Sequence, residues 1–327
     1  MEYLRSLKLR WRLTNVSVAK DHEAVRIALG NEPINFVGLS YGSQLGSQYA
    51  ALFPNNIRTL ALDGILQHSQ AEAANLLIEA TSYDLGLSHF FAWANTNESS
   101  GLKGQNVESL WYELLTNAST TPIPAPSCNN TDCYSNVSDE DIRFNAHRYL
   151  TFAEDLGLGS SWETLASALY NASQGDASAL STRLTDPTAW SFLAIGCLDW
   201  SHKASSTMLE IFAQQTMAKE YAPLTQGATQ MWTLQHGCLG WPVKTMNPPR
   251  KLDVKTNTTV LLTQSTADPS TGLPWALGVL EEIENKVLVL RRGDGHTSLP
   301  LGGKTAEAIV QYLVTGEAPS PGLVLDS

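Results

Sequence analysis

The chain has 327 residues, 43% of them hydrophobic, and its 32 acidic and 21 basic side chains give a formal net charge of −11. This acidic balance argues against nucleic acid as a partner, because binding to phosphates requires a basic surface. No apolar run approaches the roughly 18 residues of a membrane-spanning helix. The length suits one core with an inserted segment better than two unrelated domains.

The first predicted elements surround a serine. The apolar run at 34–37 predicts a strand, and residues 38–42, Gly-Leu-Ser-Tyr-Gly, lead from it into a helix predicted over 43–53. A G-x-S-x-G pattern between a strand and a helix is typical of a nucleophile elbow, a sharp turn that exposes the serine hydroxyl. Ser40 is therefore the candidate nucleophile, and the backbone N–H of Tyr41 is a candidate oxyanion donor. An ordinary Gly/Ser turn is the alternative.

Beyond a predicted strand at 59–62, the pattern changes to helical periodicity from residue 65 to about residue 249. Helices are predicted over 71–94, 107–115, 141–156, 162–170, 187–193, 207–221 and, near the C-terminus, 304–314. The stretch 116–136, with three prolines, is predicted to be an exposed excursion. The chain thus divides into an N-terminal part of the core with the elbow (1–65), a helical cap (66–249) and a C-terminal part of the core (250–327).

Two further strands are predicted at 259–264 and 286–290, each followed by a loop with a polar residue. Asp268 follows the first strand, and His296 lies in the glycine-containing loop after the second. A serine hydroxyl needs a base to take its proton and an acid to orient that base. Ser40, Asp268 and His296, in that order and each after a strand, predict the triad of an α/β-hydrolase fold, in which helices cover a parallel sheet.

Six short motifs occur in one order along the chain, at residues 38–42, 62–64, 194–200, 238–242, 266–269 and 295–298. Together they resemble the tripeptidyl-aminopeptidase-like serine peptidases, which are secreted α/β-hydrolases related to prolyl aminopeptidases. The resemblance implies a triad of Ser40, Asp268 and His296 beneath a helical cap. It also implies a peptide substrate, cleaved near a free N-terminus to release short peptides or single residues.

Other carboxylates are candidates for roles at this site. Asp63 is the alternative to Asp268 as the acid, although its side chain would more simply cap the turn that follows it. An exopeptidase also needs a carboxylate to bind the substrate's α-ammonium group. Asp199 is the candidate, with a structural hydrogen-bonding role as the alternative, and Glu154 and Asp155 are further candidates. The sequence contains no H-E-x-x-H metal motif and no glycine-rich phosphate loop, so neither a metal nor a cofactor is expected.

Only 39 residues precede Ser40, and residues 18–30 among them have the spacing of an amphipathic helix. Members of the family that the chain resembles have several strands and a Gly-rich loop ahead of the elbow, and that loop supplies a second oxyanion donor. We therefore expect an incomplete sheet with an unpaired edge beside the elbow strand, and poor solubility and little activity of the chain expressed alone. The alternative functions are an esterase-type acyl hydrolase and a catalytically impaired hydrolase-fold protein.

Two sequence features indicate the secretory pathway. Seven N-x-S/T sequons are present, at Asn15, Asn97, Asn117, Asn129, Asn136, Asn171 and Asn257. The four cysteines could form two disulfides, with Cys128–Cys133 closing a small loop and Cys197–Cys238 tying the cap to the core, although spacing alone allows three connectivities. The first 12 residues carry charges every few positions and do not form a signal peptide. We therefore expect this chain to be the C-terminal part of a longer secreted glycoprotein.

Overall fold

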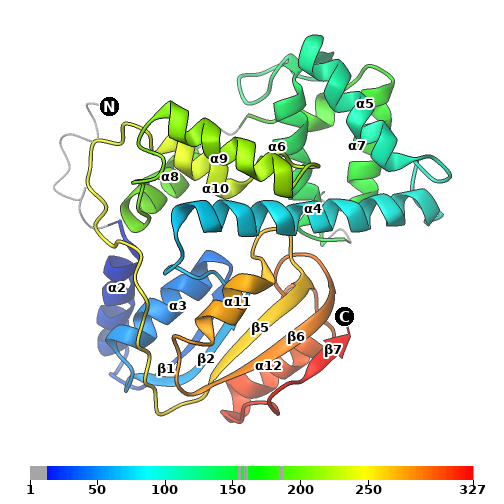
Figure 1. Cartoon of the computed structure of the whole chain (residues 1–327). Coiled ribbons are helices and arrows are strands. Elements are labelled where there is room, and N and C mark those ends of the chain that lie inside the picture. The colour runs from blue at the N-terminus through cyan, green and yellow to red at the C-terminus, as the bar shows by residue number, and fades with distance from the viewer. Residues whose placement is uncertain (1–12, 154–155, 158, 160, 184–186, 327) are drawn as a thin grey trace.

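The structure is a computed structural model that describes residues 13–153, 156–157, 159, 161–183 and 187–326. It has two parts (Figure 1). One part is a core formed by a parallel sheet with helices on both faces, and the other is a helical cap inserted between β2 and β5. The α/β fold predicted from the sequence is therefore present.

Five parallel strands form the sheet, in the order β1 (Ile34–Leu39), β2 (Ile57–Asp63), β5 (Val260–Ala267), β6 (Lys286–Asp294) and β7 (Val324–Asp326). The first four are the strands that the sequence predicts. Among the described strands, β1 lies at an edge of the sheet with β2 as its partner. Because the strands are parallel, the segments that follow β1, β2, β5 and β6 meet at one edge of the sheet, beneath the cap.

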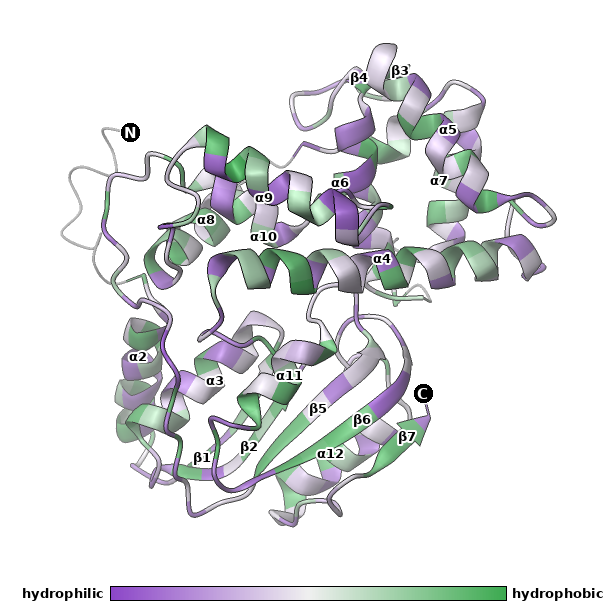
Figure 2. Ribbon diagram, viewed as in Figure 1, coloured by the Kyte–Doolittle hydropathy of each residue, from purple (hydrophilic) through white to green (hydrophobic). Residues whose placement is uncertain are grey.

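Helices cover both faces of the sheet: α2 (Asn15–Ala28), α3 (Tyr41–Leu52) and α11 (Leu273–Val279) pack on one face, and α12 (Gly303–Thr315) packs on the other. Successive residues of a strand point to opposite faces. Accordingly, Leu60 and Leu62 belong to the core under the first three helices, and Ala61 belongs to the core under α12. The strands are hydrophobic along most of their length and become hydrophilic toward the edge beneath the cap (Figure 2).

The cap contains α4 (Glu72–Thr96), α5 (Val107–Thr120), α6 (Asp139–Leu150), α7 (Trp162–Ser173), the 3-10 turn η1 (Ser178–Leu180), α8 (Pro187–Asp199), α9 (Met208–Tyr221) and α10 (Gln230–Gly237). The 25-residue helix α4 lies across the sheet edge, with α5, α6 and α7 above its C-terminal part and α8, α9 and α10 above its N-terminal part (Figure 1). The cap helices therefore form two groups that share α4 as a floor.

The predicted and observed elements differ in several places, among them the strand β7, which the sequence did not predict. Helices α10 and α11 are missing from the prediction because eight and seven residues are too few for a clear helical period. Helix α6 ends at Leu150, short of the predicted residue 156. The predicted excursion at 116–136 contains part of α5 and a two-stranded ribbon of β3 (Ile123–Pro124) and β4 (Asn136–Val137).

Both expected cysteine pairs form disulfides, Cys128–Cys133 and Cys197–Cys238. The second one joins α8 to the end of α10, so it lies within the cap and does not tie the cap to the core as expected. No helix among the described residues is long and apolar enough to cross a membrane.

The structure corrects one of the seven candidate glycosylation sites. Asn15 is 4% exposed, and its amide nitrogen Nδ2 is buried. A glycan on this atom does not fit the packing of the described residues, so we no longer expect glycosylation at Asn15. The asparagines at 117, 129, 136, 171 and 257 are exposed, and Asn97 is half-buried.

Candidate active site

Ser40 lies at the turn between β1 and α3, in a strained backbone conformation. Its φ of 55° and ψ of −122° lie outside the regions that residues with a side chain usually adopt. A methyl group at Gly38 would lie 2.2 Å from the carbonyl oxygen of Gly42, so the chain can form this turn only with glycine at position 38. Gly42 is not crowded in the same way, since a Cβ there would meet nothing within 4 Å.

Asp268 and His296 are in direct contact. Nδ1 of His296 lies 2.9 Å from Oδ2 and 3.0 Å from Oδ1 of the Asp268 carboxylate, which is buried. The same carboxylate accepts hydrogen bonds from the backbone N–H groups of Ser270 and Thr271, both at 2.8 Å, and from that of Thr297 at 3.2 Å. Burial raises the pKa of Asp268, but the charge of His296 and these hydrogen bonds outweigh burial and hold the pKa below its usual value.

The same environment favours protonation of His296. Burial lowers the pKa of His296, but the negative charge of Asp268 and its hydrogen bond, assisted by the charges of Asp63 and Glu79, outweigh burial and raise the pKa above its usual value. Because Nδ1 is held by Asp268, Nε2 is the ring nitrogen left to exchange a proton with another group.

Ser40 and His296 lie on either side of the turn that follows β2. The backbone N–H of Ser40 donates to the carbonyl oxygen of Asp63 at 2.9 Å. The next residue, Gly64, has a φ of 67°, and a Cβ added there would lie 3.2 Å from Cε1 of His296. Asp268 thus contacts the Nδ1 side of His296, and Ser40 and His296 each contact the segment 63–64 at the end of β2, although no hydrogen bond joins Ser40 to His296 among the described residues.

Asp63 has a different set of partners from the one a catalytic acid requires. Its Oδ1 accepts the hydroxyl of Thr263 at 2.8 Å, and its Oδ2 accepts the backbone N–H groups of Ser298 at 2.6 Å and Leu299 at 2.8 Å. The structure therefore places Asp268, and not Asp63, against the imidazole. The sequence also suggests that the Asp63 side chain caps the turn after β2. In the structure its carboxylate instead accepts hydrogen bonds from the loop beyond His296.

The contacts of Asp199 favour the structural hydrogen-bonding role over the binding of a substrate amine. Its carboxylate is fully buried and accepts the N–H of Asn15 at 3.1 and 3.2 Å, the amide Nδ2 of Asn247 at 2.9 Å and the hydroxyl of Tyr41 at 3.3 Å. Burial raises the pKa of Asp199 to about 6. These contacts join α2, α3 and the end of α8, as the structural alternative predicts. Glu154 and Asp155 lie outside the described residues.

Sequence reasoning missed Glu79 on α4. This side chain is 1% exposed, its Oε2 accepts the backbone N–H of Met231 at 2.7 Å, and burial raises its pKa to about 7. Glu79 also interacts electrostatically with His296. A single glutamate in a long helix gives no sequence signal, and Glu79 comes near His296 only because α4 lies across the sheet edge.

A cavity of about 460 Å³ lies between the two groups of cap helices, lined by residues of α6, α8 and α10. His147 forms part of its wall. Its Nε2 atom lies 3.1 Å from the carbonyl oxygen of Pro269 and 3.4 Å from the hydroxyl of Ser270, and these two residues directly follow Asp268 in the chain. Thr229 and Gln230 line the cavity at the end of α10 that Glu79 contacts. The volume is in the range of small-ligand sites.

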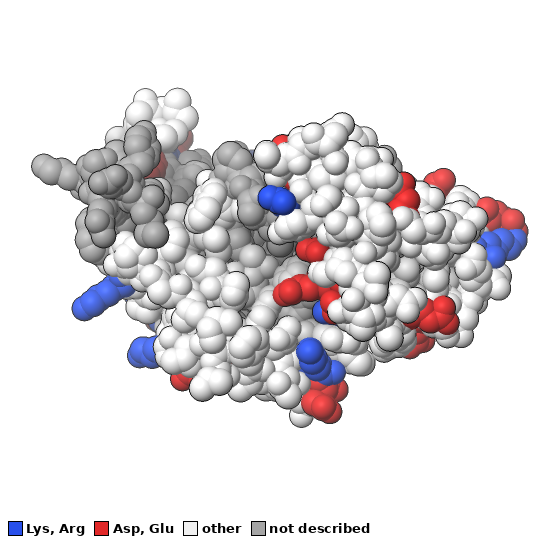
Figure 3. Space-filling model, turned by 90° about the horizontal axis from the view of Figure 1, so that it is seen from above, with Lys and Arg blue, Asp and Glu red and all other residues white. Residues whose placement is uncertain are grey.

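Seen from above the cap, the surface is mostly uncharged, with acidic and basic side chains scattered (Figure 3).

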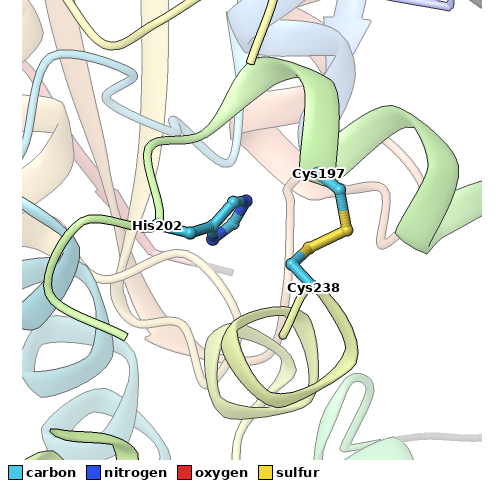
Figure 4. Close-up of side chains that lie close together, drawn as sticks. All are labelled: Cys197, His202 and Cys238. Atoms are coloured by element: carbon cyan, nitrogen blue, oxygen red, sulfur yellow. A yellow bond between two sulfur atoms is a disulfide. The ribbon is translucent and has the colours of Figure 1, made fainter. Parts of the chain in front are cut away.

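One group of side chains has the composition of a metal site. Within the described part of the chain, potential ligand atoms of Cys197, His202 and Cys238 lie within 4.8 Å of one another. The two sulfur atoms are bonded to each other, and the imidazole lies beside them (Figure 4). Since metal ions bind thiolates and the disulfide leaves none, this group does not form a metal site in the oxidised protein.

Comparison with known proteins agrees with this geometry. Residues 6–178, just over half of the chain, match the family described as alpha/beta hydrolase fold, and residues 222–324 match the family described as TAP-like protein. The chain therefore belongs to the α/β-hydrolase fold family, and its C-terminal part is similar to TAP-like proteins.

Three relatives illustrate the similarity. "Putative hydrolase YuaR" of Escherichia coli (strain K12) is 27% identical over 312 residues, which are 90% of this chain and 59% of that protein. "Serine protease Hip1" of Mycobacterium tuberculosis (strain ATCC 25618 / H37Rv) is 22% identical over 94% of this chain and 60% of that protein. "Tripeptidyl aminopeptidase" of Streptomyces lividans is 27% identical over 36% of this chain and 23% of that protein. The chain thus spans about 60% of the length of the first two relatives.

Proposed function

We propose that the protein is a serine exopeptidase that cleaves peptides near a free N-terminus through an acyl-enzyme intermediate. The observation that carries this proposal is the contact between Asp268 and His296 at the sheet edge where the strained turn presents Ser40. The similarity to a serine protease and to a tripeptidyl aminopeptidase supports the choice of peptides as substrates.

In this mechanism the hydroxyl of Ser40 attacks the carbonyl carbon of the scissile peptide bond, and Nε2 of His296 takes the hydroxyl proton. The N–H of Tyr41, among the first N–H groups of α3 and without an acceptor inside the helix, stabilises the oxyanion. His296 then gives its proton to the leaving amine. Water, activated by His296, releases the acyl group from Ser40, while Asp268 holds the tautomer of the imidazole throughout.

The test of the proposal is covalent labelling of the protein by a fluorophosphonate probe, which reacts with activated serines. We expect stoichiometric labelling at Ser40, because only this hydroxyl has His296 as a base. The Ser40→Ala variant should show no labelling above background. Ser47→Ala is the matched control, because the hydroxyl of Ser47 lies further along α3 and donates to the carbonyl oxygen of Ser43, within the same helix. Labelling of Ser40→Ala at the wild-type level would contradict the assignment. A wild-type protein that is folded and unlabelled would favour the catalytically impaired alternative.

We further propose that Glu79, which is buried and accepts the backbone N–H of Met231 next to the cavity-lining residue Gln230, binds the α-ammonium group of the substrate. The charge of Glu79 is one of those that raise the pKa of His296. Acetylation removes the ammonium charge, and a charge-assisted hydrogen bond contributes about 1.5–3 kcal/mol, so wild-type kcat/KM should be about tenfold to a hundredfold lower for an acetylated peptide anilide than for the free amine.

In Glu79→Gln we expect this preference for the free amine to disappear. Asp84→Asn is the matched control, because Asp84 also lies on α4 and also accepts backbone N–H groups, those of Leu224 and Thr225. It should keep the preference. Equal cleavage of both peptides by the wild-type protein, or faster cleavage of simple esters, would favour the esterase alternative.

We also infer that the protein matures in the secretory pathway. Two disulfides and five exposed sequons support this inference, because disulfides persist mainly in oxidising compartments. Enzymatic removal of N-glycans from the protein of its native source should lower its mass. An unchanged mass would remove this support, and a glycan found on Asn15 would contradict the burial of that residue.

A further inference from the structure

We propose that Asp63 and Arg291, two buried residues of opposite charge, hold the loop that presents His296 between them and act as positioning residues for its imidazole. They lie on β2 and β6, on either side of β5. The proposal rests on the proposed function only where it calls His296 the base, since the contacts and the expected titration of His296 do not depend on the reaction.

Arg291 binds the loop through its carbonyl groups. The residue is 1% exposed, and its guanidinium donates to the carbonyl oxygens of Asp294 at 2.9 Å, Gly295 at 2.8 Å and Thr297 at 3.1 Å. It also donates through Nε to the hydroxyl of Ser298 at 3.2 Å. Gly295 and Thr297 have φ values of 98° and 62°, so this segment cannot satisfy its carbonyl groups as a regular strand or helix. The buried guanidinium takes the place of that regular structure.

Asp63 binds the same loop through its N–H groups. Its Oδ2 accepts the N–H groups of Ser298 and Leu299, directly after the residues that Arg291 contacts, and its Oδ1 is fixed by the hydroxyl of Thr263. The anion therefore satisfies two N–H donors of the loop, and the cation satisfies three of its carbonyl acceptors. Buried ion pairs add little to stability compared with well-packed apolar residues. A gain in the position of His296 accounts for keeping two buried charges here.

Both charges also act on His296 directly or through its neighbours. The titratable groups that face this part of the loop, besides Asp63 and Arg291, are Asp268 in the loop after β5, Glu79 and His89 on α4, and His147 on α6. Burial lowers the pKa of His147 to about 4, so it is neutral near pH 7. The charge of Asp63 raises the pKa of His296. The positive charge of Arg291 interacts with Asp63 and Asp268. A positive charge beside the loop of His296 disfavours the protonated imidazole, so it opposes the effect of these carboxylates.

The two charges therefore predict opposite changes. In Asp63→Asn the amide oxygen can still accept the N–H groups of the loop, and the amide nitrogen can hydrogen-bond the hydroxyl of Thr263. The negative charge is lost, so the pKa of His296 should fall by on the order of one unit. Arg291→Met removes a positive charge, so the pKa of His296 should rise. Arg291→Lys keeps the charge but cannot reach all four acceptors, so that pKa should change little while kcat falls about tenfold to a hundredfold with KM nearly unchanged.

The experiment is an NMR titration of the His296 Cε1–H resonance in the whole protein, assigned with His296→Gln, together with the acid limb of the pH profile of kcat/KM. Arg292→Met is the matched control, because the neighbouring Arg292 is 68% exposed and pairs with Asp326 at 2.7 Å. It should leave the pKa of His296 and kcat at wild-type values. If Arg291→Met does not fold, the contrast between Asp63→Asn and Arg291→Lys carries the test.

Shifts of the His296 pKa in the same direction in Asp63→Asn and Arg291→Met, or values equal to those of Arg292→Met, would overturn the proposal. A full recovery of kcat in Arg291→Lys would also overturn the positioning role. If the pKa of His296 shifts as expected but neither the wild-type protein nor any variant hydrolyses peptides or esters, the proposed function is wrong. The positioning of His296 by Asp63 and Arg291 is then still supported.

Discussion

Replacing Asp268 by Asn is expected to lower kcat about ten-thousandfold while the protein remains folded. The Asp268 carboxylate only accepts hydrogen bonds, so it holds the proton of His296 on Nδ1 and leaves Nε2 free to take the proton of Ser40. An asparagine amide can donate to Nδ1. It would then stabilise the other tautomer, in which Nε2 already carries a proton and cannot act as a base.

The measurement is kcat at the pH optimum, with thermal unfolding as the check on folding. The comparison is Asp63→Asn, which removes a second buried carboxylate at the same sheet edge, one that binds the loop of His296 but does not contact the imidazole. Its loss of kcat should be far smaller. If Asp63→Asn is the more damaging change, Asp63 is the acid and the assignment of Asp268 is wrong.

The second large effect is expected at the elbow, where Gly38→Ala should destabilise the protein by about 3 kcal/mol or more and abolish fluorophosphonate labelling. The added methyl would lie 2.2 Å from the carbonyl oxygen of Gly42 and 2.7 Å from its carbonyl carbon. Both are backbone atoms of the first turn of α3, so the clash cannot be relieved by a side-chain rotation. Relief requires α3 to move away from β1, and this movement displaces Ser40.

Gly42→Ala is the control for this prediction. A Cβ at Gly42 meets nothing within 4 Å, and alanine is the better helix former by up to about 1 kcal/mol, so stability should be unchanged or slightly higher. Urea unfolding of both variants, followed by tryptophan fluorescence, measures the difference. Equal stabilities would show that the crowding at position 38 does not constrain the elbow.

The sequence by itself determined the elements whose signals are local. A G-x-S-x-G pattern between a strand and a helix located Ser40, because the turn constrains residue types within five positions. The buried parallel strands β1, β2, β5 and β6 were recognisable because each is a short apolar run bounded by turn residues. Asp268 and His296 follow from the same reasoning, since parallel strands bring the residues after their C-terminal ends to one edge.

Only the tertiary structure decided which polar groups meet across the fold. Asp63, Asp199 and Asp268 each lie at or near the end of a strand or helix. The order of the strands favours Asp268 as the acid, but only the structure shows that its carboxylate contacts His296. Their partners are far along the chain: Asp63 bonds Ser298, and Asp199 bonds Asn15. Such contacts depend on how the loops and the cap pack on the sheet.

The roles of Glu79 and Arg291 have the same origin. A glutamate in α4 and an arginine in β6 are ordinary residues of their elements, and each becomes important only because burial removes water and leaves a few protein groups as its partners. The spacing of hydrophobic residues and the residue types of a turn depend on residues a few positions apart, so they can be recognised from the sequence. The environment of a buried charge is set by residues tens to hundreds of positions away, so only the folded chain specifies it.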